Sequence, residues 1–151
     1  MGTVADTSLR ALQKEVSQLR WPQWLQRYLF FRKAKGIHGV HSPLAYRLAT
    51  DVFMKPGSQP IATRLQEALP DTTFHRVPVA QLSEALPSFP EEPRSALWVP
   101  DLLSDRARWL QACADARVTL AIDCFDCGLL LHTPEIREKQ YLRQRMLPVG
   151  Q

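Results

Sequence analysis

The sequence predicts an α/β domain, and the order of the expected elements is the reason. Apolar residues recur at helical spacing through the first 50 residues, strand and helix patterns then alternate, and a run of strands closes the chain. Alternation indicates a sheet covered by helices, and the closing run indicates an antiparallel edge. We expect one domain over 1–151, with a helical N-terminal extension at 1–55 and an α/β part at 60–151.

Three helices are expected before the sheet. The first spans 8–20, with an apolar face made of Leu9, Leu12, Val16 and Leu19. The second begins at Pro22 and ends at Gly36. The third begins at Ser42-Pro43, where a hydroxyl cap precedes a proline in the first helical turn, and it continues to Phe53.

The rest of the chain is expected to form the sheet and its covering helices. Further helices are expected at 61–69, 80–88 and 104–116, the last of them capped by Ser104. Strands are expected at 74–79, 96–99, 118–122, 125–131 and 141–146, with the last one lying against 125–131.

Composition places the chain among globular proteins, because hydrophobic residues make up 45% and charged residues 23%. No stretch approaches the roughly 18 to 20 apolar residues that span a bilayer, and Met1 to Arg10 has no apolar core of signal-peptide type. We therefore expect a cytoplasmic protein without a membrane span. The odd count of three cysteines argues against a disulfide framework.

Charge is distributed unevenly along the chain. Residues 1–50 contain eight Lys and Arg and two acidic residues, whereas residues 51–135 contain seven basic and twelve acidic residues. This asymmetry indicates either an anionic partner or mutual attraction between the two parts, and both interpretations stay open.

Two segments carry a resemblance to a known family. Residues 28–53 read YLFFRKAKGIHGVHSPLAYRLATDVF, in which His38 to Leu44 form an H-G-x-H-S-P-L motif. Val118 to Leu129 read VTLAIDCFDCGL, and Glu138 to Tyr141 read EKQY. These segments resemble the N-terminal leader, the closing V-T-L segment and the K-Q start of the last strand in a group of bacterial class I S-adenosylmethionine (SAM)-dependent methyltransferases. The resemblance implies a reduced Rossmann-like, class I methyltransferase-like sheet with antiparallel C-terminal strands.

The sequence departs from that family at the SAM site. The family holds SAM with a Gly-x-Gly loop after its first strand, where glycine lets the backbone approach the ligand closely. No glycine occurs between Gly57 and Gly128, and the nearest equivalent of the loop is Val77-Pro78-Val79-Ala80. Proline and β-branched valine do not replace such glycines. We therefore expect a degenerate SAM site, and residues 60–95 do not align with the family.

The function expected from this combination is that of a methyltransferase-like protein without catalytic activity, acting through binding or assembly without a cofactor. One alternative is an active SAM-dependent methyltransferase whose cofactor site is atypical or completed by a partner. Another is a basic RNA-associated protein. The loss of family strands leaves an edge or apolar patch to be covered, so a homodimer or a partner protein is expected, with the 8–33 helices as the contact.

The helix that begins at Pro22 combines aromatic and basic residues in one stretch. Such a stretch stacks on RNA, lies on a membrane surface, or packs against the core or a partner with its arginines in solvent. The residues concerned are Trp21, Trp24, Tyr28, Phe30, Phe31, Arg20, Arg27, Arg32 and Lys33.

A candidate ligand or anion site precedes the third helix, because a helix N-terminus attracts anions. Its residues are Lys33, Lys35, His38, His41 and Ser42, and the alternative is a structural loop that ties down helix ends.

A zinc site is a further hypothesis, made of His38, His41, Cys124 and Cys127. Against it, residues three apart on a strand point to opposite faces. The same argument separates Asp123 and Asp126 as an acid–base pair, and no catalytic residue is assigned.

Overall fold

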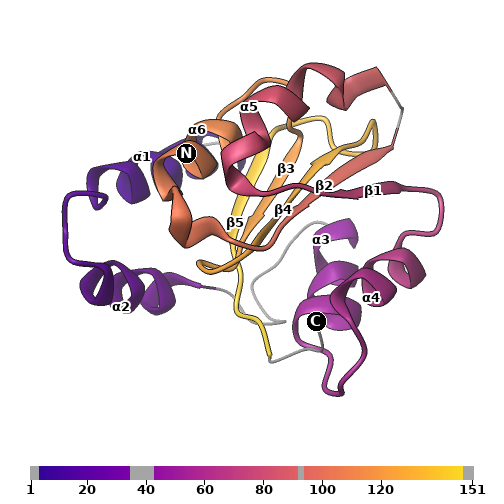
Figure 1. Ribbon diagram of the computed structural model, residues 1–151, viewed down its shortest axis with the longest axis horizontal. Helices are drawn as coiled ribbons and strands as arrows, with labels where there is room; N and C mark the ends of the chain where they lie inside the picture. Colours follow the sequence, from indigo (N-terminus) through magenta and orange to yellow (C-terminus); the bar gives the residue numbers. More distant parts are fainter. Residues whose placement is uncertain (1–3, 35–42, 92–93, 148–151) are drawn as a thin grey trace.

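The computed structural model describes residues 4–34, 43–91 and 94–147, and within them five strands form one mixed sheet with helices on both faces (Figure 1). The predicted α/β class is confirmed. The strands lie in the order β1-β2-β4-β3-β5. Their bounds are β1 Thr73–Arg76, β2 Ser95–Val99, β3 Leu120–Asp123, β4 Gly128–His132 and β5 Gln140–Arg143.

Strand β4 occupies the middle of the sheet and runs antiparallel to both of its neighbours, β2 and β3. Strands β1 and β2 pair in parallel, and so do β3 and β5. The expectation that the last strand lies against 125–131 is wrong, because β2 and β3 take both edges of β4. Strand β5 instead pairs in parallel with β3, with Tyr141 opposite Ala121. The expected antiparallel edge is therefore wrong: the antiparallel strand is the central β4.

The helices follow the predicted order, with corrections to their bounds and caps. Their bounds are α1 Val4–Ser17, α2 Gln23–Lys33, α3 Pro43–Leu48, α4 Ile61–Ala68, α5 Leu82–Ala85 and α6 Arg106–Cys113. The first helix spans Val4–Ser17 rather than 8–20, and only Leu82–Ala85 of the predicted 80–88 helix is α-helical. The third helix does not run evenly to Phe53, because residues Ala49–Phe53 widen into a π-helix, η1. The cap of α6 is Asp105 rather than Ser104: the Asp105 carboxylate accepts a hydrogen bond from the Arg108 amide at 3.1 Å.

Short 3-10 turns complete the chain path. They are η2 Val79–Gln81 and η3 Leu86–Glu91 on either side of α5, and η4 Leu102–Ser104 before α6.

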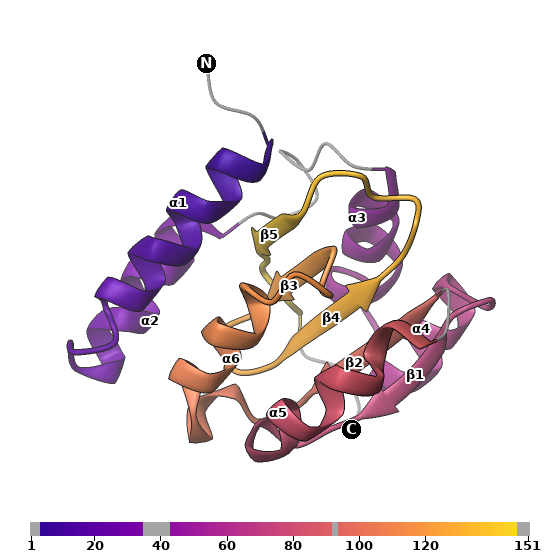
Figure 2. The same cartoon turned by 90° about the horizontal axis from the view of Figure 1, so that it is seen from above.

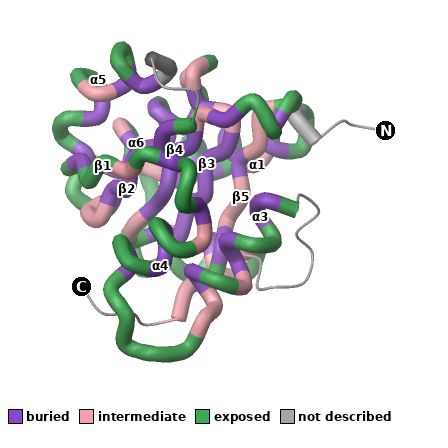
Figure 3. Tube along the Cα trace, turned by 90° about the vertical axis from the view of Figure 1, so that its right-hand side faces the viewer, coloured by how far each residue is buried: buried purple, intermediate pink, exposed green. Residues whose placement is uncertain are grey.

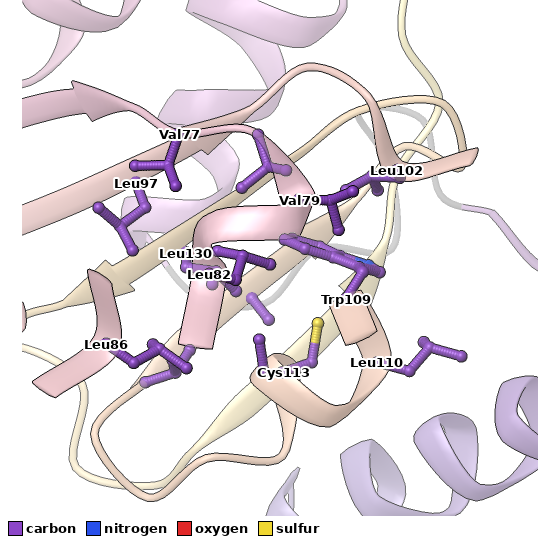
Figure 4. Close-up of a cluster of buried hydrophobic side chains, with 14 of the residues drawn as sticks. Val77, Val79, Leu82, Leu86, Leu97, Leu102, Trp109, Leu110, Cys113 and Leu130 are labelled. Carbon is purple, nitrogen blue, oxygen red and sulfur yellow. The ribbon is translucent and has the colours of Figure 1, made fainter. Parts of the chain in front are cut away.

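Two apolar clusters show that the sheet is the middle of three layers (Figures 1 and 2). Helices α1, α5 and α6 cover one face, where Trp109 is fully buried among aliphatic side chains (Figure 4). Helices α3 and α4 cover the other face, where Leu48, Phe53 and Leu65 meet the sheet. Every residue of β2 and β3 is buried, while exposed residues lie on the outer helices (Figure 3).

The two edges of the sheet differ in how they are covered. At β5 the amide of Tyr141 donates to the Ser8 hydroxyl of α1 at 2.9 Å. At β1 three of the four residues are exposed. This edge is short and carries His75 and Arg76, and both features discourage pairing with another sheet.

Among the helices that the structure describes, none has both the length and the apolar character needed to cross a membrane.

Candidate functional site

The predicted anion site can be placed only at its first residue. Lys33 is the last residue of α2 and is exposed. Lys35, His38, His41 and Ser42 lie outside the described residues. The H-G-x-H-S-P motif therefore stays a prediction.

The cysteines of the zinc hypothesis flank the turn between β3 and β4. The amide of Cys124 donates to the Cys127 carbonyl at 2.9 Å, which closes the turn. The expectation that the two thiols point to opposite faces of one strand is wrong, because the chain reverses between them. Burial raises the pKa of the Cys124 thiol well above its ordinary value, and a hydrogen bond with Cys127 raises that pKa further.

This environment favours the thiol over the thiolate that binds zinc. Within residues 4–34, 43–91 and 94–147, no group of three His, Cys, Asp or Glu side chains is arranged to hold a metal ion. His38 and His41 lie outside these residues. All three cysteines are free thiols.

Asp123 and Asp126 do not form an acid–base pair. Asp123 ends β3 and has no exposed surface, whereas Asp126 is half-exposed in the following turn and binds Arg27 of α2 at 2.5 Å. The separation expected from the sequence is therefore present. The structure gives the two carboxylates different structural partners.

Asp123 is the centre of a buried polar cluster, which we call the Asp123 cluster: Asp123, Arg106, Tyr141, Glu15 and Arg143. Arg106 donates to both carboxylate oxygens of Asp123, at 3.2 Å and 2.8 Å. The Tyr141 hydroxyl donates to Oδ2 at 2.6 Å. Glu15 of α1 completes the cluster by accepting from Arg106 at 3.5 Å and from Arg143 at 3.3 Å.

The electrostatics of the cluster are those of a closed ion network. Burial alone would lower the pKa of Arg106, but Asp123, with smaller contributions from Tyr141 and Glu15, outweighs this effect and the pKa is raised. Burial raises the pKa of Glu15, and the attraction of Arg106 only partly offsets that rise. Burial also raises the pKa of Tyr141 well above its usual value. Arg106 is thus held in its charged form and Tyr141 in its neutral form, whereas burial opposes the ionised form of Glu15 that Arg106 and Arg143 bind.

Aromatic rings close the cluster on the side of α2. The Arg106 guanidinium lies 4.6 Å from the Phe125 ring centre and 5.4 Å from that of Phe30. Phe125 has a φ of 72°, and the amide of Asp126 donates to the Cys124 carbonyl at 2.9 Å, so the chain makes a γ-turn here. A β-branched or aromatic residue rarely adopts such a φ. The Asp123 carboxylate binds the Phe125 amide at 2.8 Å and holds this turn.

The Asp123 cluster is therefore a structural joint. It connects α1, α6, β3 and β5, and its side chains are nearly inaccessible to a substrate: Asp123, Glu15 and Arg106 are 0%, 2% and 7% exposed. Sequence reasoning pointed to Asp123 and to the segment that contains Tyr141. It missed Arg106 and Glu15, because contacts across 17 and 91 residues leave no local pattern.

We expect Glu15 to make stability fall as pH rises. The pKa of Glu15 is higher in the folded chain than the ordinary value of 4.5. Its contribution to the free energy of unfolding is therefore fully present below pH 4.5 and is lost as the pH rises through the folded pKa. Glu15→Gln removes this ionisation. The urea midpoint of the variant should therefore decline less than that of the wild type between pH 4.5 and neutral pH. Equal declines in the two proteins would show that Glu15 ionises as freely in the folded chain as in the unfolded one.

The segment that would correspond to a SAM loop is used by the fold. Val79 is fully buried, and its amide donates to the Asp101 carboxylate at 2.9 Å. The amide of Val77 donates to the Trp98 carbonyl at 2.9 Å. Side chains thus fill the space beside this backbone, and two of its amides have protein partners. These residues do not fit SAM in the manner of a glycine-rich loop.

A groove of about 390 Å³ lies beside the exposed edge of the sheet. It is lined by His75 and Arg76 of β1, by Ala85 of α5, by Ser88 and Phe89 of η3, and by neighbouring residues of the sheet. Its lining contains no carboxylate and no thiol. Of these lining residues His75 alone is of a type that commonly transfers protons in catalysis, so the groove offers mainly surface for contact.

Helices α1 and α2 carry most of the exposed large apolar side chains. Leu9 and Val16 of α1 are about half exposed, and Trp24 and Tyr28 of α2 are 71% and 59% exposed. The two helices lie at the same end of the sheet, one above the other in Figure 1, and a short turn joins them. Exposed apolar groups that cluster on one surface indicate a contact site.

Comparison with protein-family models, with curated proteins and with solved structures gives no match to this chain.

Proposed function

We propose that this chain is a methyltransferase-like protein that acts through binding or assembly rather than catalysis. The observation that carries the proposal is the state of Asp123, the carboxylate of the V-T-L segment. It is completely buried, and Arg106, Tyr141 and the Phe125 amide satisfy it. A carboxylate in this state holds the fold together and has no access to a substrate.

The two C-terminal parts of the resemblance, Val118 to Leu129 and Glu138 to Tyr141, support the methyltransferase-like description, because they bind each other in the fold. Val118 to Leu129 supply β3, the turn and the start of β4, and the K-Q-Y residues begin β5. The Lys139 ammonium donates to the carbonyls of Asp115 and Val118, and the Tyr141 hydroxyl donates to Asp123. The shared residues thus have structural roles in this chain. A reduced Rossmann-like sheet is the fold that we propose on this basis.

Helices α1 and α2 are the proposed binding surface. On α1 the exposed Leu9 and Val16 lie next to the buried Leu12, so half of the apolar stripe faces solvent. The exposed Leu9 and Val16 support the prediction of a homodimer or protein partner through the 8–33 helices. The expected cytoplasmic location stays a prediction.

A calorimetric titration with SAM and S-adenosylhomocysteine tests the proposal. We expect no binding heat at ligand concentrations far above those that saturate an ordinary SAM enzyme. Saturable binding at micromolar concentration would contradict the proposal and favour the active enzyme.

A further inference from the structure

We propose that the exposed face of α2 binds single-stranded nucleic acid. Trp24 and Tyr28 would stack on bases, while Arg32 and its basic neighbours contact phosphates. This inference rests on the proposed function of binding: it assigns a nucleic acid to α2, while the exposed apolar stripe of α1 stays the proposed protein contact. We call this surface the α2 face: Trp24, Tyr28 and Arg32, with Arg20 and Trp21 just before the helix and Lys33 at its end.

Geometry brings the rings and a cation into one line. Trp24, Tyr28 and Arg32 are spaced four residues apart and therefore follow one another along a single helix face. The Arg32 guanidinium lies 5.8 Å from the Tyr28 ring centre, and that of Arg20 lies 5.5 Å from the Trp21 ring. Aromatic rings with adjacent cations form the surface on which unpaired bases stack.

Charge complementarity selects an anionic partner. Residues 16–50 contain six Lys and Arg and no Asp or Glu. Arg27 is neutralised by Asp126, but no ion pair to Arg20, Arg32 or Lys33 is present in the part of the chain that the structure describes. Arg145 adds positive charge at the end of α2, where it donates to the Phe31 carbonyl at 2.8 Å.

The opposite side of α2 is fixed to the protein. Phe30 is fully buried, and its ring centre lies 5.3 Å from that of Phe125 and 5.4 Å from the Arg106 guanidinium. The Asp123 cluster therefore holds the helix in place. A surface that is rigid before binding loses less conformational entropy when a flexible strand binds to it.

The pattern of α2 favours nucleic acid over a lipid surface. A helix that lies in a membrane interface separates its apolar and polar residues onto two faces. In α2 these residues are interspersed around the helix, and the aliphatic Leu25 and Leu29 are half-buried against the protein. The most exposed apolar groups of α2 are flat rings, which suit base stacking. A duplex hides its base faces, so the expected partner is a single strand.

Fluorescence anisotropy with dye-labelled oligothymidine and oligouridine, using the full chain at low salt, tests the proposal. Trp24→Leu and Tyr28→Leu should each weaken binding roughly tenfold, as expected for the loss of one base–ring stack. Tyr46→Leu is the matched control, because Tyr46 is an exposed aromatic residue of α3 on the other side of the sheet. Its affinity should equal that of the wild type.

Salt dependence tests the phosphate contacts separately. Arg32→Gln should reduce the slope of log affinity against log salt by about 0.7, the value for one phosphate contact on a single strand. Arg137→Gln removes an exposed arginine between β4 and β5 and should leave the slope unchanged. All of these substitutions are at exposed positions, so the thermal midpoint should stay close to that of the wild type.

Three outcomes would overturn the proposal. The first is no binding of either oligonucleotide at low salt. The second is binding that Tyr46→Leu weakens as much as Trp24→Leu does. The third is stronger binding to phosphatidylserine vesicles than to oligonucleotides, with the same dependence on Trp24. None of these outcomes changes the SAM titration, so this inference can fail while the proposed non-catalytic function stands.

Discussion

Asp123→Asn should be among the most destabilising single substitutions in this protein. The change keeps the shape of the side chain but removes the charge that Arg106 binds through two hydrogen bonds. Breaking a buried ion pair in this way costs about 3–5 kcal/mol, because a desolvated charge loses its partner. Urea unfolding of the purified variant measures the loss directly.

Asp126→Asn is the matched control for this prediction. Asp126 lies three residues after Asp123 and also pairs with an arginine, Arg27, but both side chains of that pair are about half exposed. An exposed pair contributes about 0–1 kcal/mol. If the two variants lost equal stability, the Asp123 cluster would not be the joint that holds α1, α6 and β5 to the end of β3.

Gly128→Ala should also reduce stability strongly. A Cβ at this position would lie 2.4 Å from the Trp109 ring and 3.0 Å from the Ile122 carbonyl oxygen. Trp109 is fully buried between α6 and the sheet, so the ring has little room to move. Overpacking of this kind costs roughly 1–3 kcal/mol and sometimes more. The thermal midpoint and the urea midpoint should both fall.

Trp109→Phe provides the test of cause. The smaller ring lacks the atoms that the new Cβ would meet, so Gly128→Ala should be less harmful in the Trp109→Phe background than in the wild type. A double-mutant cycle measures this coupling. Additive effects would mean that the Trp109 ring does not determine the need for glycine at 128.

The sequence predicted the elements of the fold well where local signals exist. Pro43 predicts the start of the third helix and is the first residue of α3, and the helix predicted at 61–69 forms as α4 at Ile61–Ala68. The pairing of the strands was harder to predict. A strand is predicted at 141–146 and forms at Gln140–Arg143, but its parallel partner β3 follows from the tertiary arrangement.

The orientation of α1 shows a limit of periodicity. The spacing of Leu9, Leu12, Val16 and Leu19 predicts a single apolar face, yet Leu9 and Val16 are exposed. The helix is rotated because Ser8 and Glu15 bind groups inside the protein, at the Tyr141 amide and at Arg106. The hydrogen bonds of Ser8 and Glu15 thus take the place of burying Leu9 and Val16. Their partners are distant in the sequence, so helical periodicity alone does not predict this orientation.

The candidate binding surface on α2 could be partly predicted from the sequence, because its residues are close together in the chain. Trp24, Tyr28 and Arg32 lie within one short segment, so composition alone indicated an aromatic and basic helix. Which rings face solvent depends on the packing of Phe30 against Phe125, two residues that are far apart in the sequence. The sequence therefore predicts the aromatic and basic residues of α2, and the structure shows which of them are exposed.

The central claim is that the segment after β1 belongs to the core and does not form a SAM site. Amide chemical shifts recorded by NMR during a titration with S-adenosylhomocysteine test it most directly, because they detect even weak binding and locate it. The account predicts no saturable shift for the amides of Val77, Val79 and Gln81 at millimolar ligand. Saturable shifts at these amides would contradict it and place a cofactor site where the structure has a packed turn.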